Sequence, residues 1–113
     1  MDTVTLRRAL TTALKSRDAV AVSALRSALA AIENAGAVDA AQAPLPGSGP
    51  IAGAVAGLGA SEVERRPVDV RAVVTAEVEQ RHAAAREYAE LGRPDRAERL
   101  RAEAEVLAAH LRS

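Results

Sequence analysis

Two histidines, His82 and His110, are the residues of this 113-residue chain best suited to acid–base chemistry or metal binding. A metal site would need them to converge with carboxylates such as Glu79 or Glu105, and their spacing does not require this. Cysteine is absent, so no thiolate nucleophile, disulfide or cysteine-based zinc site can form. We therefore interpret both histidines as solvated surface residues, and we expect no catalytic residues, no metal and no cofactor.

A glycine-rich stretch, residues 47–59, is the only candidate for a phosphate-binding loop. It has no Gly-Lys-Ser/Thr ending, no strand pattern leads into it, and its glycine spacing does not match a dinucleotide fingerprint. The Gly47-Ser48-Gly49 string also lacks the spacing of a nucleophile elbow. We interpret the stretch as a surface loop, and the sequence contains no catalytic machinery that we can name.

Arginine is the remaining chemical signal, because Lys15 is the only lysine among the 15 basic residues. Four arginines of the two predicted C-terminal helices have a glutamate four residues away, and such pairs typically lie on a solvated helix face. These pairs are Glu77–Arg81, Arg86–Glu90, Arg99–Glu103 and Arg101–Glu105. Arg65, Arg66 and Arg93 fall outside this pairing and are the predicted contacts to RNA phosphates or to a partner.

Overall composition limits the kind of binding that is expected. The 15 basic and 15 acidic residues give a formal net charge of zero, which excludes a generally basic nucleic-acid binder. Tyr88 is the only aromatic residue, so there is no platform on which the bases of a single strand could stack.

Apolar residues at helical spacing predict four helices, near residues 3–15, 18–34, 68–91 and 94–111. Asp2 or Thr3 and Asp18 are placed to cap the first two helices, and Gly36 is placed to end the second. Asp69 supplies the negative charge that the positive N-terminus of the third helix favours. The Gly92-Arg93-Pro94 string predicts a tight turn that makes the last two helices an αα-hairpin. The fold class is therefore all-α, a four-helix domain of two helical hairpins. Its predicted core is Leu25, Leu29, Ile32, Val74, Val78, Leu100 and Leu107.

The domain organisation follows from the break in this pattern. We expect a single domain over residues 1–113, with an inserted Pro/Gly-rich loop over 37–67 between the second and third helices. The longest uncharged run, residues 40–61, is interrupted by prolines and glycines and so cannot span a bilayer as a helix. We expect a cytoplasmic protein that does not bind membranes.

Several strings together resemble the GatB/YqeY family, which comprises small YqeY-like proteins and the C-terminal region of the aspartyl/glutamyl-tRNA amidotransferase B subunit. The resembling segments are Ala24–Asn34, Glu77–Arg81, Glu87–Tyr88, Gly92–Asp95 and Ala102–Leu107. Their order and spacing are similar over most of the chain outside the loop. The chain differs from the family in its Pro/Gly-rich insertion. The resemblance implies the N-terminal helical domain of a YqeY-like protein and carries the label of a carbon–nitrogen ligase with glutamine as amido-N-donor.

Three functions remain open on the sequence, and the third takes the family label literally, as an amide-transferring enzyme for which no catalytic residue is identified. The resemblance implies a non-catalytic helical module that contacts tRNA or the tRNA amidotransferase complex, and Arg65, Arg66 and Arg93 favour this hypothesis. The alternative is a protein-interaction module that joins a helical partner or a second copy and has no role with RNA. A zero net charge and the lack of aromatic residues for base stacking favour this second hypothesis.

Overall fold

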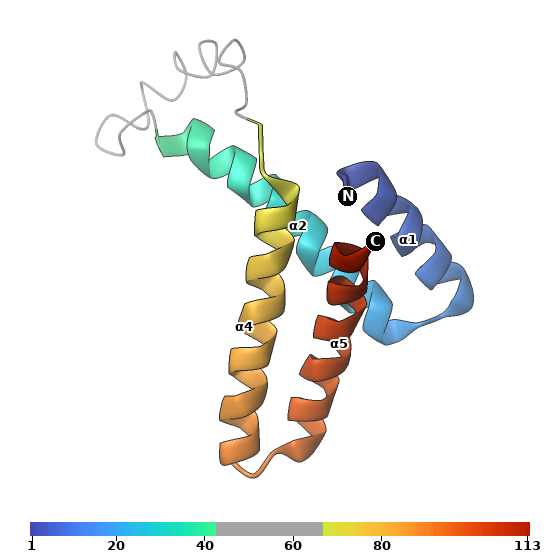
Figure 1. Ribbon diagram of the computed structural model, residues 1–113, viewed down its shortest axis with the longest axis vertical. Helices are drawn as coiled ribbons and strands as arrows, with labels where there is room; N and C mark the ends of the chain where they lie inside the picture. Colours follow the sequence, from blue (N-terminus) through green and yellow to red (C-terminus); the bar gives the residue numbers. More distant parts are fainter. Residues whose placement is uncertain (43–66) are drawn as a thin grey trace. The chain divides into compact units, whose positions relative to one another are not determined.

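The computed structural model describes residues 1–42 and 67–113, and this part of the chain folds as α-helices without a strand (Figure 1). The helices are α1 (Thr3–Ser16), α2 (Ala19–Gln42), α4 (Val70–Glu90) and α5 (Pro94–Arg112). The predicted all-α class is therefore confirmed. One compact unit contains Met1–Ile32 together with Asp69–Ser113, and Glu33–Val68 forms a second unit.

An aspartate begins each of the first three helices. The side chains of Asp2, Asp18 and Asp69 each accept the backbone N–H three residues further on, at 2.8, 3.1 and 3.1 Å. Each aspartate thus satisfies an N–H group that the first turn of a helix leaves without a backbone acceptor, and its charge complements the positive end of the helix dipole.

The second helix is longer than predicted. Gly36 is the predicted end and residue 37 the predicted start of the loop, but α2 continues to Gln42. Glycine in a helix interior costs only about 1 kcal/mol relative to alanine, and the alanine-rich residues on both sides favour the helix. The remainder of the predicted loop, residues 43–66, lies outside the described part of the chain.

The turn between α1 and α2 is formed by Arg17 and Asp18. Arg17 has φ 57° and ψ 39°, the left-handed conformation that glycine usually supplies after a helix. Its N–H bonds the Leu14 carbonyl at 3.2 Å, and the N–H of Asp18 bonds the Ala13 carbonyl at 3.0 Å. These bonds use carbonyl groups that the end of a helix leaves free.

Helices α4 and α5 form the predicted αα-hairpin and lie side by side (Figure 1). Gly92 takes a positive φ of 76° in the turn, Pro94 is the first residue of α5, and the N–H of Arg93 bonds the Tyr88 carbonyl at 2.8 Å. Residues 89–96 are all exposed, so the turn end of the hairpin is open to solvent.

One large side chain from each helix is fully buried, and these are Leu6, Leu25, Val74 and Leu107. Alanine completes much of the core, which lets the helices approach closely. The buried alanines are Ala13, Ala21, Ala24, Ala28, Ala85, Ala97 and Ala104. Each of the four helices therefore contributes one large side chain to the interior of the larger unit.

Four of the seven predicted core residues are buried, namely Leu25, Ile32, Val74 and Leu107. The prediction is wrong for Leu29, Val78 and Leu100, which are half-buried. Leu14 of α1 is exposed as well. A core filled largely by alanine covers a narrow stripe of each helix, so leucine and valine at its edges retain contact with water.

Candidate functional site

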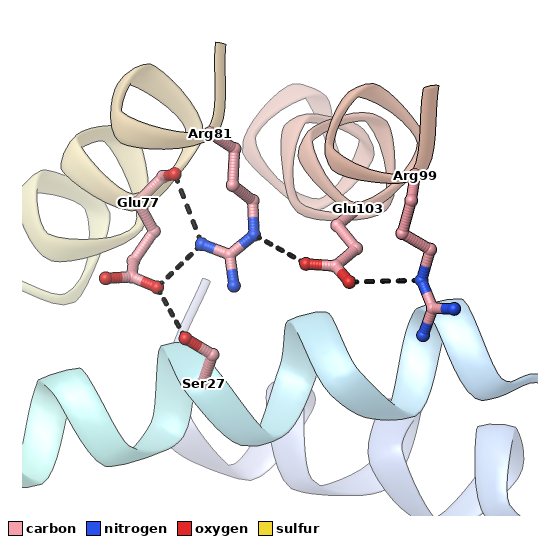
Figure 2. A network of polar contacts seen from close by, with 5 residues as sticks. All are labelled: Ser27, Glu77, Arg81, Arg99 and Glu103. Atoms are coloured by element: carbon pink, nitrogen blue, oxygen red, sulfur yellow. Dashed lines mark hydrogen bonds and ion pairs between the residues drawn. The ribbon is translucent and has the colours of Figure 1, made fainter. Parts of the chain in front are cut away.

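The hairpin and α2 are joined by a network of charged and polar side chains (Figure 2). Arg81 lies at its centre: its Nη1 is 2.8 Å from Glu77 Oε1, and its Nε is 3.1 Å from Glu103 Oε1. Glu77 Oε1 also accepts a 2.9 Å hydrogen bond from the Ser27 hydroxyl, and Glu103 Oε2 is 3.3 Å from Arg99 Nε. The network thus connects α2, α4 and α5.

Three members of this network are nearly removed from water, with side-chain exposures of 11% for Arg81, 13% for Glu77 and 10% for Glu103. Two arginines balance two glutamates, and no buried side-chain nitrogen or oxygen of the described residues lacks a hydrogen-bond partner. Such a satisfied, neutral network has no spare group for catalysis. We interpret it as the structure that holds the hairpin against α2.

The spacing of the paired arginines predicts a solvated face. The prediction of a solvated face is wrong for Arg81 and Glu77, whose side chains are only 11% and 13% exposed. Ser27 of α2 donates a hydrogen bond to Glu77. The Glu77–Arg81 and Arg99–Glu103 pairs themselves are confirmed.

The other two predicted pairs do not form. Arg101 lies 3.5 Å from Glu98 instead of pairing with Glu105, and Glu105 pairs with Arg112. Over residues 1–42 and 67–113, the ion pairs do not include Arg86–Glu90. Side chains on an exposed helix face choose between partners three, four and seven residues away, and these choices differ little in energy.

The turn end of the hairpin carries the described part of the predicted contact site. Arg93 precedes α5 and lies 4.0 Å from Asp95, with side-chain exposures of 53% and 77%. Arg93 has no acidic residue four positions away in the sequence, and in the structure it makes this long contact with Asp95, two residues away, instead. Arg65 and Arg66, the other predicted contacts, lie outside the described residues.

Beside the turn, the guanidinium of Arg96 stacks 5.5 Å from the centre of the Tyr88 ring, within the range of a cation–π interaction. A surface hollow of about 600 Å³ is lined there by Tyr88, Asp95, Arg96, Arg99, Leu100 and Glu103. A second hollow of about 310 Å³ is lined by Ala84, Glu87, Tyr88 and Leu91. Leu91 is 73% exposed. The hairpin end therefore offers arginines, one aromatic ring and one exposed leucine.

No group of three or more potential metal ligands occurs within the described segments. His82 is exposed and His110 is half-buried near the end of α5. None of the helices at residues 1–42 and 67–113 is long and apolar enough to cross a bilayer.

Sequence reasoning missed a set of cations at the start of the chain. Arg7, Arg8, Lys15 and Arg17 are all exposed, and no ion pair links them to another described residue. The zero net charge of the whole chain concealed them. Counting charges separately for each helix would have found them, because residues 3–17 contain no aspartate or glutamate.

Comparison with protein-family models, with curated proteins and with solved structures finds no match for this chain. The resemblance to the GatB/YqeY family therefore stays a prediction.

Proposed function

We propose that this chain is a non-catalytic helical module that contacts tRNA through the turn end of the α4–α5 hairpin. The partner class comes from the resemblance to the GatB/YqeY family, whose amidotransferase members act on aminoacyl-tRNA. The observation that supports the contact surface is the solvent-open turn end, with exposed Arg93 and Arg96 beside Tyr88. Because residues 89–96 are exposed, a partner can contact this end without a change in the core.

The chemistry of the turn end suits phosphate contact. The Arg93–Asp95 contact is long and exposed, so it contributes little and can be exchanged for a phosphate oxygen. Stacking on Tyr88 restricts the Arg96 guanidinium, which lowers the conformational entropy that Arg96 would lose on binding.

The activity label implied by the resemblance, a carbon–nitrogen ligase with glutamine as amido donor, is not part of this proposal. Among the charged groups that line the larger hollow, Arg99 pairs with Glu103, Arg96 stacks on Tyr88, and Asp95 contacts Arg93. A site for amide transfer would need polar groups directed at a substrate.

Filter binding with total tRNA tests the proposal. We expect Arg93→Glu combined with Arg96→Glu to weaken binding at least tenfold at about 50 mM salt, because two phosphate contacts become repulsive. The matched control combines Arg101→Glu with Arg112→Glu. It changes the net charge by the same amount, at positions of α5 that lie away from the turn. Equal affinity of the two double variants would contradict the proposal. A separate double variant, Arg65→Glu with Arg66→Glu, tests the sequence prediction that these two arginines also contact RNA.

A protein-interaction module is the second candidate, and the exposed Leu91 beside its hollow favours it. Here the partner would be a helix or a second copy that covers Leu91. Sedimentation equilibrium of the wild type and of Leu91→Asp tests the second-copy form. A wild type that dimerises with increasing concentration, together with a monomeric Leu91→Asp variant, would support it. A wild type that stays monomeric, like the variant, would contradict it.

A further inference from the structure

Charge is unevenly distributed along this neutral chain. Residues 1–32 contain five Lys or Arg and two Asp, a net charge of +3, whereas residues 69–113 contain eight Arg and nine Asp or Glu. The two aspartates, Asp2 and Asp18, are occupied as helix caps. The hairpin that we propose to contact tRNA therefore lacks the net positive charge that would attract a polyanion, and the first helix has it.

The cations of α1 share its solvent side. One face of the helix, defined by spacings of four, three and four residues, carries Val4, Arg8, Thr11 and Lys15. Arg7 lies at the edge of this face. Leu6 and Ala13 are buried on the other side. Arg8 and Lys15 are separated by about 10 Å along the helix axis at about 1.5 Å per residue, a span that can meet more than one phosphate of a nucleic-acid strand.

The end of this helix adds a fourth exposed cation. Arg17 holds the left-handed conformation that glycine or asparagine adopts with less strain. Lys15 and Arg17 also complement the negative end of the helix dipole, but Arg7 and Arg8 lie in the interior of α1 and have no such role.

We infer that Arg7, Arg8, Lys15 and Arg17 form a phosphate-binding surface, the α1 basic face, which supplies the electrostatic attraction for RNA. This inference rests on the proposed function for its ligand, an RNA backbone. An anionic membrane surface is disfavoured, because an interfacial helix must insert a continuous apolar side. In α1, Leu6 and Ala13 are buried, and the exposed large apolar side chains, Val4 and Leu14, lie at opposite ends of the helix.

The test measures the affinity of labelled tRNA by fluorescence anisotropy as a function of salt. The α1 variant combines Arg7→Gln, Arg8→Gln and Lys15→Gln, and its control combines Arg86→Gln, Arg101→Gln and Arg112→Gln. Glutamine and arginine have similar helix propensities, and both variants remove three positive charges. We expect the α1 variant to bind at least tenfold more weakly at about 50 mM salt and to lower the salt slope by about 1 for each phosphate that it no longer neutralises. The control should stay within about twofold of the wild type.

Equal decreases in affinity for the two variants would show that only net charge matters and would overturn the inference. Loss of binding in the Arg93/Arg96 variant, with full binding in the α1 variant, would overturn the inference while leaving the proposed function intact. A wild type that does not bind tRNA would overturn both. Binding to vesicles of phosphatidylserine and phosphatidylcholine but not to tRNA would also overturn it, in favour of a membrane surface.

Arg17→Asn keeps the test decisive if the triple variant does not fold. Asparagine tolerates the left-handed conformation, so we expect the Tm to stay within a few degrees of the wild type while affinity for tRNA falls. An unchanged affinity would exclude Arg17 from the α1 basic face and overturn the inference as stated for these four residues.

Discussion

Replacing Arg81 by methionine should destabilise the fold far more than replacing a surface arginine. Arg81 is the shared partner of Glu77 and Glu103, which have side-chain exposures of 13% and 10%. Methionine has a similar helix propensity and fills a similar volume, so the change removes mainly the charge and the hydrogen bonds. Glu77 then keeps only Ser27, and Glu103 keeps only Arg99.

The cost lies between two limits. Removing one partner of a fully buried ion pair costs about 3–5 kcal/mol, and an exposed pair contributes about 0–1 kcal/mol. Because the two glutamates retain some exposure and one other partner each, we expect a decrease in the free energy of unfolding of about 2–4 kcal/mol. A small domain has about 5–15 kcal/mol of stability in total, so the Tm should fall by at least about 10 °C.

Urea denaturation followed by circular dichroism measures this decrease. The control is Arg101→Met, whose partner Glu98 lies at 3.5 Å with both side chains exposed, and we expect it to cost about 0.5 kcal/mol or less. In a Glu77→Gln, Glu103→Gln background, Arg81→Met should cost much less than in the wild type, because no unpaired carboxylate is left. A cost below about 1 kcal/mol for Arg81→Met in the wild type would refute the interpretation of the network as a structural lock.

The core, the hairpin turn and the first helix cap each give a further prediction. Leu107→Ala should cost about 2–5 kcal/mol in urea denaturation, whereas the half-buried Leu29→Ala should cost about 1–2 kcal/mol, and equal costs would contradict the burial pattern. Gly92→Ala should lower stability by about 1 kcal/mol through backbone strain alone, since nothing lies within 4 Å of an added Cβ; an unchanged Tm would be inconsistent with the positive φ. The Thr5 N–H that bonds Asp2 lowers the pKa of Asp2, so the cap contributes stability above the unfolded-state pKa and loses it as the pH falls through the folded pKa. Asp2→Asn should therefore show a smaller decrease in Tm than the wild type between about pH 6 and pH 2, and parallel curves would count against this cap.

Local signals in the sequence were sufficient for most of the fold. Asp2, Asp18 and Asp69 predicted helix starts because a capping aspartate acts within three residues, and Gly92 before Pro94 predicted the hairpin turn. Gly36 failed as a helix end. A glycine predicts such an end only when the residues after it disfavour helix, and here they are rich in alanine.

The candidate site depended on contacts that sequence spacing does not contain. The partner of Arg81 on α5, Glu103, is 22 residues away, and the cover over Glu77 comes from Ser27, 50 residues away. Spacing along one helix predicted the Glu77–Arg81 pair but could not show that a third helix buries it. The cations of α1 required no structure to find, only a count of charge by helix.

Chemical-shift mapping of the ¹⁵N-labelled chain with tRNA at low salt tests the central claim most directly, because it reports the contacted residues individually. The proposed function predicts shifted or broadened amide signals over residues 89–96, and the α1 basic face predicts the same over residues 7–17. Raising the salt to about 200 mM should reverse both sets, since the contacts are electrostatic. A spectrum that tRNA leaves unchanged, or changes confined to residues outside both surfaces, would contradict the claim that this helical module binds tRNA through them.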